Sequence, residues 1–123
     1  MIEKMSQNFQ PGDFLVFQLE AGFALLRLLA VDTDGNQRVW HVAAYNDFFP
    51  DVEAAEMATS MPDLLKKSSG HFALTTRAFE STQVAKIAKF PLGQDDLGPL
   101  NDWRADESRE VSDRSVRLML GFR

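Results

Sequence analysis

Two histidines are the residues of this sequence best suited to acid–base chemistry. His41 and His71 are the only histidines in the 123-residue chain. An imidazole titrates near neutral pH, so such a pair could exchange protons with a substrate, as in RNA cleavage. Both lie in segments that alternate like β-strands, and one could reach the other across a sheet. We favour the interpretation that each is a hydrogen-bonded strand residue, because catalysis requires a demonstrated geometry. A small enzyme that pairs one of them with a neighbouring carboxylate is the alternative.

The remaining residue types give little support to metal or nucleophile chemistry. The chain has no cysteine, which excludes disulfides, thiolate catalysis and cysteine-ligated zinc or iron–sulfur sites. The stretch Asp32-Thr-Asp34-Gly-Asn36 is similar to the start of a calcium loop, but the twelfth position is Ala43 instead of Glu. A hairpin turn explains it better. The sequence also contains no G-x-S-x-G or P-loop motif. We therefore predict no metal, no cofactor and no catalytic residue.

Negative charge is concentrated in two segments. The formal net charge is −5; residues 46–63 hold five acids and no Lys or Arg, and residues 91–113 hold seven acids and two Arg. Nucleic acid is a poor partner for such a chain because phosphate binding needs a basic face. A basic protein would be attracted to it.

Aromatic residues lie inside both acidic segments. They occur in the stretch from Tyr45 to Pro50 and at Trp103. Aromatic anchors within an acidic rim suit recognition of a basic protein surface. The alternative is that these rings only cover the open end of a barrel or sandwich. The predicted partner-binding residues are Asp47, Phe48, Phe49, Asp51, Glu53, Glu56, Asp95, Asp96, Asp102 and Trp103.

Alternation and turn signals predict the elements that position these residues. An antiparallel meander comes first, since Asp34-Gly35 favours a tight turn and the flanking runs alternate. A helix follows, capped by Asp51. The predicted strands are 13–20, 23–31, 38–45, 71–79 and 115–122, the helix is 51–61, the segment 83–90 is either strand or helix, and 91–113 is a long acidic loop.

These elements predict a single α+β domain over residues 1–123, with a loose leader at 1–11. Its core is a twisted antiparallel sheet or partial SH3-like barrel of five to six strands with one short helix. Residues 1–13 show no apolar signal-peptide core, and the longest apolar run, 22–31, contains Arg27 and is too short to span a bilayer. We therefore expect no membrane association and a cytoplasmic location.

Residues 11–45 resemble two families of small bacterial barrel proteins. Pro11-Gly12-Asp13 leads into a hydrophobic strand, and Gly22 to Arg27 forms G-x-x-x-x-R. This opening resembles a class of immunity proteins that neutralise secreted bacterial toxins. It also resembles the small SH3-like endoribonucleases of toxin–antitoxin pairs, but those carry Arg-Pro where this chain has Arg27-Leu28, and they are basic. The acidic charge therefore fits the immunity class better, and neither resemblance implies a site residue.

The leading function prediction is a non-enzymatic protein-binding module, in its specific form an inhibitor or immunity protein for a basic bacterial toxin. Two alternatives stay open. One is the acid–base enzyme at His41 or His71. The other is a homo-oligomer, such as a homodimer, whose edge strands pair between copies.

Overall fold

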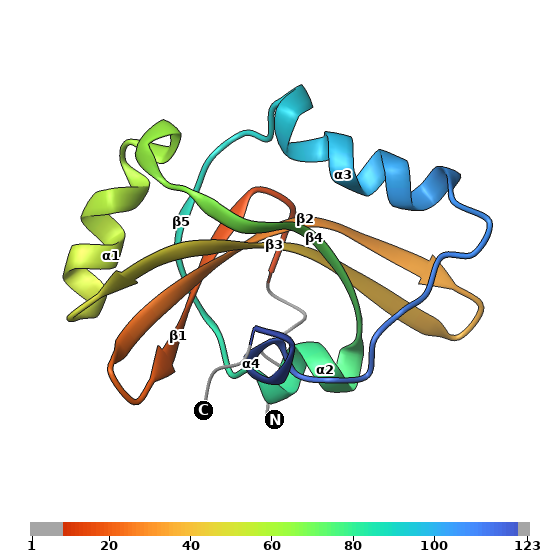
Figure 1. Ribbon diagram of the computed structural model, residues 1–123, viewed down its shortest axis with the longest axis horizontal. Helices are drawn as coiled ribbons and strands as arrows, with labels where there is room; N and C mark the ends of the chain where they lie inside the picture. Colours follow the sequence, from red (N-terminus) through yellow and green to blue (C-terminus); the bar gives the residue numbers. More distant parts are fainter. Residues whose placement is uncertain (1–8, 121–123) are drawn as a thin grey trace.

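The fold is built on one open, twisted antiparallel sheet with helices on both faces. The computed structural model describes residues 9–120, apart from the side chain of Asp34. The five strands lie in the order β4-β3-β2-β1-β5 (Figure 1). The strands are β1 (Asp13–Leu19), β2 (Gly22–Asp34), β3 (Gln37–Phe49), β4 (Lys67–Thr75) and β5 (Ala85–Lys89). The helices are α1 (Val52–Thr59), the 3₁₀ turn η2 (Pro62–Leu64), α2 (Thr76–Ser81), α3 (Gln94–Ala105) and α4 (Val116–Met119).

The predicted meander of three strands is confirmed. β1 pairs with β2 and β2 pairs with β3, both antiparallel. The turn between β2 and β3 contains Gly35 at φ +64, a backbone conformation that glycine adopts without steric cost. The sheet class and the α+β assignment are therefore confirmed. The prediction of one short helix is incomplete, because residues 9–120 contain three further α-helices and a 3₁₀ turn.

Each face of the sheet buries a separate part of the core. One face packs β-strand residues such as Leu26, Trp40 and Leu74 against α2 and α4. There the Trp40 ring stacks on Phe79 with centroids 4.4 Å apart. The opposite face lies under α1 and α3, which Figure 1 shows on the same side of the sheet. Residues on both faces of β2 are buried, which explains its nearly continuous run of apolar residues.

The α1/α3 face has two smaller core clusters. Phe14, Leu25 and Tyr45 pack against Ala55 of α1. Leu29 and Ala43 pack against Leu100 of α3. The helix predicted after Asp51 is confirmed as α1, and the Asp51 carboxylate accepts a hydrogen bond from the Ala54 amide at 2.7 Å.

The predicted strand at 71–79 is wrong after Thr75. β4 spans Lys67–Thr75, and α2 follows immediately. The reason is a cap, because the Thr75 hydroxyl accepts a hydrogen bond from the Ala78 amide at 3.1 Å. The ambiguous segment 83–90 contains a strand, β5, which pairs with β1.

The prediction of an irregular loop at 91–113 is wrong for residues Gln94–Ala105, which form α3. Gly98 and Pro99 lie inside this helix. The helix forms because the Asp96 carboxylate accepts from the Gly93 amide at 2.9 Å, and because Leu97 and Leu100 pack on the sheet. Acids in the first turn also favour a helix N-terminus.

The predicted closing strand at 115–122 is wrong as well. Val116–Met119 form α4, and Val116, Met119 and the C-cap residue Leu120 pack in one core cluster. Their spacing of three and four follows a helix instead of a strand. Residues 121–122 of that prediction lie outside the described residues. Of the predicted leader, 1–8 lie outside them too, while Phe9 packs edge-on against Phe79 at 5.8 Å.

Gly12 closes the turn into β1 where another residue would collide with the chain. Its φ is +96, and a Cβ there would lie 2.6 Å from the Phe90 carbonyl oxygen. Gly12→Ala should lower the free energy of unfolding by about 2–4 kcal/mol. Gly35→Ala is the matched control, since Gly35 also has a positive φ but nothing within 4 Å of its Cβ position. It should cost about 1 kcal/mol. Urea denaturation measures both, and equal losses would contradict the steric argument.

Candidate functional site

The two histidines are in direct contact on the α1/α3 face of the sheet. His41 Nδ1 lies 2.8 Å from His71 Nε2, and the ring centroids are 5.1 Å apart. His41 of β3 pairs with Ala73 of β4, so His71 is its diagonal neighbour on the same face. The prediction that one histidine could reach the other across the sheet is confirmed.

An aspartate fixes the tautomer of the pair. His41 Nε2 lies 3.0 Å from Asp32 Oδ2, and Arg104 donates to both oxygens of Asp32, at 2.6 and 3.3 Å. Burial opposes ionisation of Asp32, but the hydrogen bonds and charges of Arg104 and His41 outweigh it and lower its pKa. The ionised carboxylate can only accept, so His41 donates through Nε2–H. His41 Nδ1 then accepts from His71 Nε2–H.

A bulge in β2 brings Asp32 to this face. The β2–β3 register shifts between Leu28 and Ala30. Leu28 packs on the α2/α4 face, whereas both Leu29 and Ala30 pack in the cluster under α3. The alternation of β2 therefore changes phase, and Asp32 comes to point toward His41.

Trp103 covers the histidines from α3. Its ring lies 4.8 Å from His41 edge-on and 5.6 Å from His71, and its Nε1–H donates to the Glu110 carbonyl at 2.9 Å. His41 is fully buried as a result. Burial lowers the pKa of His41 although Asp32 opposes the change, and burial with the charges of His41 and Arg104 lowers the pKa of His71 to about 4.

This arrangement is a poorer acid–base site than its hydrogen bonds suggest. A histidine with a pKa of about 4 is a weak base at neutral pH. The neighbouring pocket, about 660 Å³, is lined by Asp32, Trp103, Arg104 and five other described residues, and neither histidine is among them. The geometry therefore favours a role of the pair in holding α3 on the sheet.

The acidic residues predicted to bind a partner fall on two separate helices. Asp51, Glu53 and Glu56 belong to α1 or its cap and are exposed. Asp95 and Asp102 are exposed on α3. Both helices lie on one side of the sheet, at opposite ends of the view in Figure 1.

Several other predicted contact residues are engaged within the fold. Asp47 accepts from the Lys66 amide at 3.0 Å, and Asp96 pairs with Lys67 at 2.8 Å. Phe49 packs in the cluster under α1, whereas Phe48 is exposed. Trp103 is half-buried over the histidines, so it covers core residues, as the alternative interpretation stated.

Sequence reasoning missed two features of this side of the molecule. One is a group of large exposed apolar side chains, Met57, Met61 and Leu64, which follow each other at helical spacing. That spacing was the available signal. The other is a cavity beside Arg27 and Tyr45, for which a single buried Arg in an apolar strand was the only hint.

Comparison of the chain with family models, curated proteins and solved structures gives no match. Within residues 9–120, no group of three or more His, Asp or Glu side chains is placed to hold a metal ion. No helix in the same range has both the length and the hydropathy to cross a membrane.

The histidine pair makes stability depend on pH. Because both pKa values are lowered in the folded state, the unfolded chain binds more protons below about pH 6.5. The free energy of unfolding should therefore fall as the pH drops from 6.5 toward 4, by on the order of 2 kcal/mol from His71. His71→Gln should flatten this loss in urea titrations at several pH values. Lys66→Gln changes an exposed residue and is the control: its free energy of unfolding should depend on pH as that of the unmodified protein does. The assignment would be contradicted if His71→Gln also kept the pH dependence of the unmodified protein.

Proposed function

We propose that this chain is a protein-binding domain that docks a basic partner through α1 and η2. The docking surface consists of the exposed apolar residues Met57, Met61 and Leu64 with the carboxylates of Glu53, Glu56 and Asp63; we call it the α1 surface. The observation that carries the proposal is the exposure of these apolar side chains, 76%, 58% and 68%. Clustered exposed apolar side chains with a polar rim are typical of interaction sites.

We infer that the three apolar residues form one stripe along α1 and η2. Positions 57, 61 and 64 are spaced by four and three, and η2 follows α1 after a non-helical residue, Met61 (φ −132, ψ 70), with hydrogen bonds from the Met61 amide to Ala58 and from the Leu64 amide to Met61. Methionine side chains adapt their shape to a partner, which suits a docking surface.

The charges around the stripe specify the partner. Residues 46–63 contain five acids and no base. Glu53, Glu56 and Asp63 are exposed, and their carboxylates form no hydrogen bond or ion pair with another described residue. Their carboxylates are therefore available to attract a basic surface and to orient it over the apolar stripe. The specific form of the proposal is an inhibitor of a basic bacterial toxin, which the resemblance of residues 11–45 supports.

Pairing of edge strands between copies has less support. The outer edge of β4 is already occupied near its end, because Ser112 exchanges backbone hydrogen bonds with Ala73 and Thr75. The other edge strand, β5, carries Lys86 and Lys89, and charged side chains discourage edge pairing.

The α1 surface can be tested with two variants that leave the core untouched. Met57→Ser/Leu64→Ser removes apolar area, and Glu53→Lys/Glu56→Lys reverses charge. A basic protein captured from host lysate by the unmodified chain should be lost from both baits. With the purified partner, charge reversal should slow association about tenfold or more at low salt and have little effect at high salt. The serine variant should mainly speed dissociation.

Asp95→Lys/Asp102→Lys is the matched control, because it reverses two exposed acids on α3 and changes the net charge equally. It should retain the partner and most of its association rate. If the α3 variant lost the partner and both α1 variants kept it, the docking surface would lie on α3. Capture that no variant weakens would refute the proposal.

A further inference from the structure

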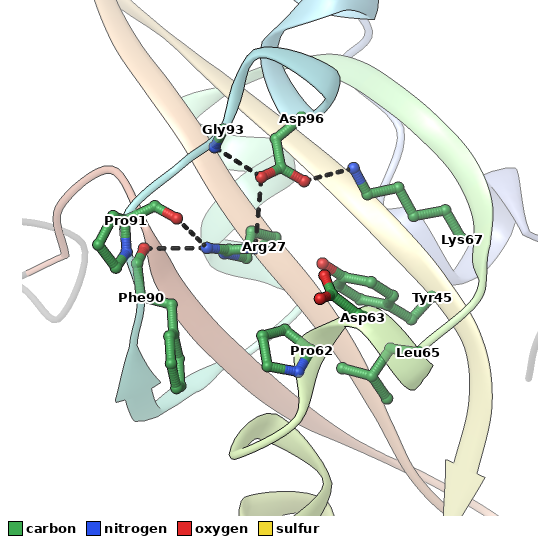
Figure 2. A pocket seen from close by; sticks show the side chains of 10 residues that line it. All are labelled: Arg27, Tyr45, Pro62, Asp63, Leu65, Lys67, Phe90, Pro91, Gly93 and Asp96. Atoms are coloured by element: carbon green, nitrogen blue, oxygen red, sulfur yellow. Dashed lines mark hydrogen bonds and ion pairs between the residues drawn. The ribbon is translucent and has the colours of Figure 1, made fainter.

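A cavity of about 500 Å³ lies between η2, the segment that enters α3, and the sheet. Figure 2 shows Arg27 and Tyr45 projecting into it from the sheet, with Lys67 and Asp96 on one side and Pro62 and Leu65 on another. Its volume is within the range of sites for small ligands. It is separate from the histidine pair and from the apolar stripe of the α1 surface.

Arg27 presents only the Nη1 group of its guanidinium to the cavity. The residue is 3% exposed, and its other two nitrogens are used: Nε donates to the Gly12 carbonyl, and Nη2 donates to the Phe90 and Pro91 carbonyls at 2.9 and 3.1 Å. Nη1 has Asp96 at 3.8 Å, which is beyond hydrogen-bond distance. Two N–H donors are thus held in a fixed direction without a full partner.

The Tyr45 hydroxyl is a second donor of this kind. The residue is 3% exposed, and its ring packs on Phe14. Among the described residues the hydroxyl has no hydrogen-bond partner. The hydroxyl oxygen is accessible although the ring is buried, so it can donate to a group inside the cavity.

The charges near Arg27 leave room for one anion. Asp96 is shared between two cations, since it accepts from Lys67 Nζ at 2.8 Å and lies beside Arg27. It also accepts from the Gly93 amide. Asp63 is the other carboxylate at the cavity; it is exposed, so water screens it. Two cations and one fully engaged carboxylate therefore leave one positive charge deep in the cavity.

We propose that this cavity binds a small organic monocarboxylate. The carboxylate would accept from Arg27 Nη1, Tyr45 Oη and Lys67 Nζ, because charged N–H groups and a hydroxyl are suitable donors for its two oxygens. The apolar body of the ligand would lie against Pro62, Leu65 and Phe90, which form the apolar walls. Partner binding at the α1 surface is not required for this site.

The test is an NMR titration of the full chain with benzoate, with benzamide as a neutral probe of the same shape. Benzoate should produce saturable shifts at Arg27, Tyr45 and Gly93. Benzamide should bind at least tenfold more weakly. Absence of a saturable benzoate shift, or equal binding of benzamide, would overturn the proposal.

Two variants test the roles of single groups without removing Arg27 from the core. Tyr45→Phe keeps the ring and deletes the hydroxyl; its thermal stability should be unchanged, and benzoate should bind about fivefold or more weakly. Asp63→Asn removes the carboxylate at the mouth and should strengthen binding about twofold. Unchanged binding by Tyr45→Phe, or weaker binding by Asp63→Asn, would contradict recognition of an anion at this place.

Discussion

A buried guanidinium in the middle of β2 joins segments that are far apart in the sequence. Arg27 binds the Gly12 carbonyl before β1 and the Phe90 and Pro91 carbonyls after β5. Its Cζ also lies 4.4 Å from the centre of the Phe14 ring. A buried charge without partners costs several kcal/mol, so the folded state requires these carbonyls in place. The chain entering α3 is thereby fixed to the sheet.

The position of α3 then determines both polar features of this face. Its first turn supplies Asp96 to the cavity beside Arg27, and its last turns supply Trp103 and Arg104 to the histidines. The helix has few apolar residues and contains Pro99, so its own propensity is low. Its contacts with the sheet at Leu97 and Leu100, and polar anchors at both ends, stabilise it.

Local signals in the sequence predicted the parts of the fold that depend on neighbouring residues. Asp34-Gly35 and the alternation on either side predicted the meander, and Asp51 predicted the start of α1. The contact between His41 and His71 also followed from two adjacent strands. Helix α3 could not be predicted this way, because Gly98 and Pro99 oppose a helix locally and contacts with distant residues, such as burial against Leu29 and Ala43, offset them.

In the candidate sites too, the sequence predicted what local features determine and missed what depends on contacts between distant segments. The acids of α1 were placed on the right helix because a capping residue and a charge run are local features. Trp103 was predicted either to anchor a partner or to cover the core, and its burial depends on where α3 crosses β3 and β4. The cavity needs residues 27, 45, 67 and 96 to converge, and no pattern along the chain encodes that convergence.

The bulge in β2 has a consequence for how this chain tolerates insertions and deletions. One extra residue opposite β3 places Asp32 beside His41 and turns Val31 to the other face. Without the bulge, the same residues in strict alternation would place Asp32 in the apolar core and remove it from Arg104. Deleting Leu29 takes away the extra residue together with the bulge, so Val31 and Asp32 would keep their faces and their partners in β3. Deleting Val31 instead would keep the bulge and move Asp32 to the opposite face. The position of a length change relative to the bulge therefore decides whether this half of the hairpin tolerates it.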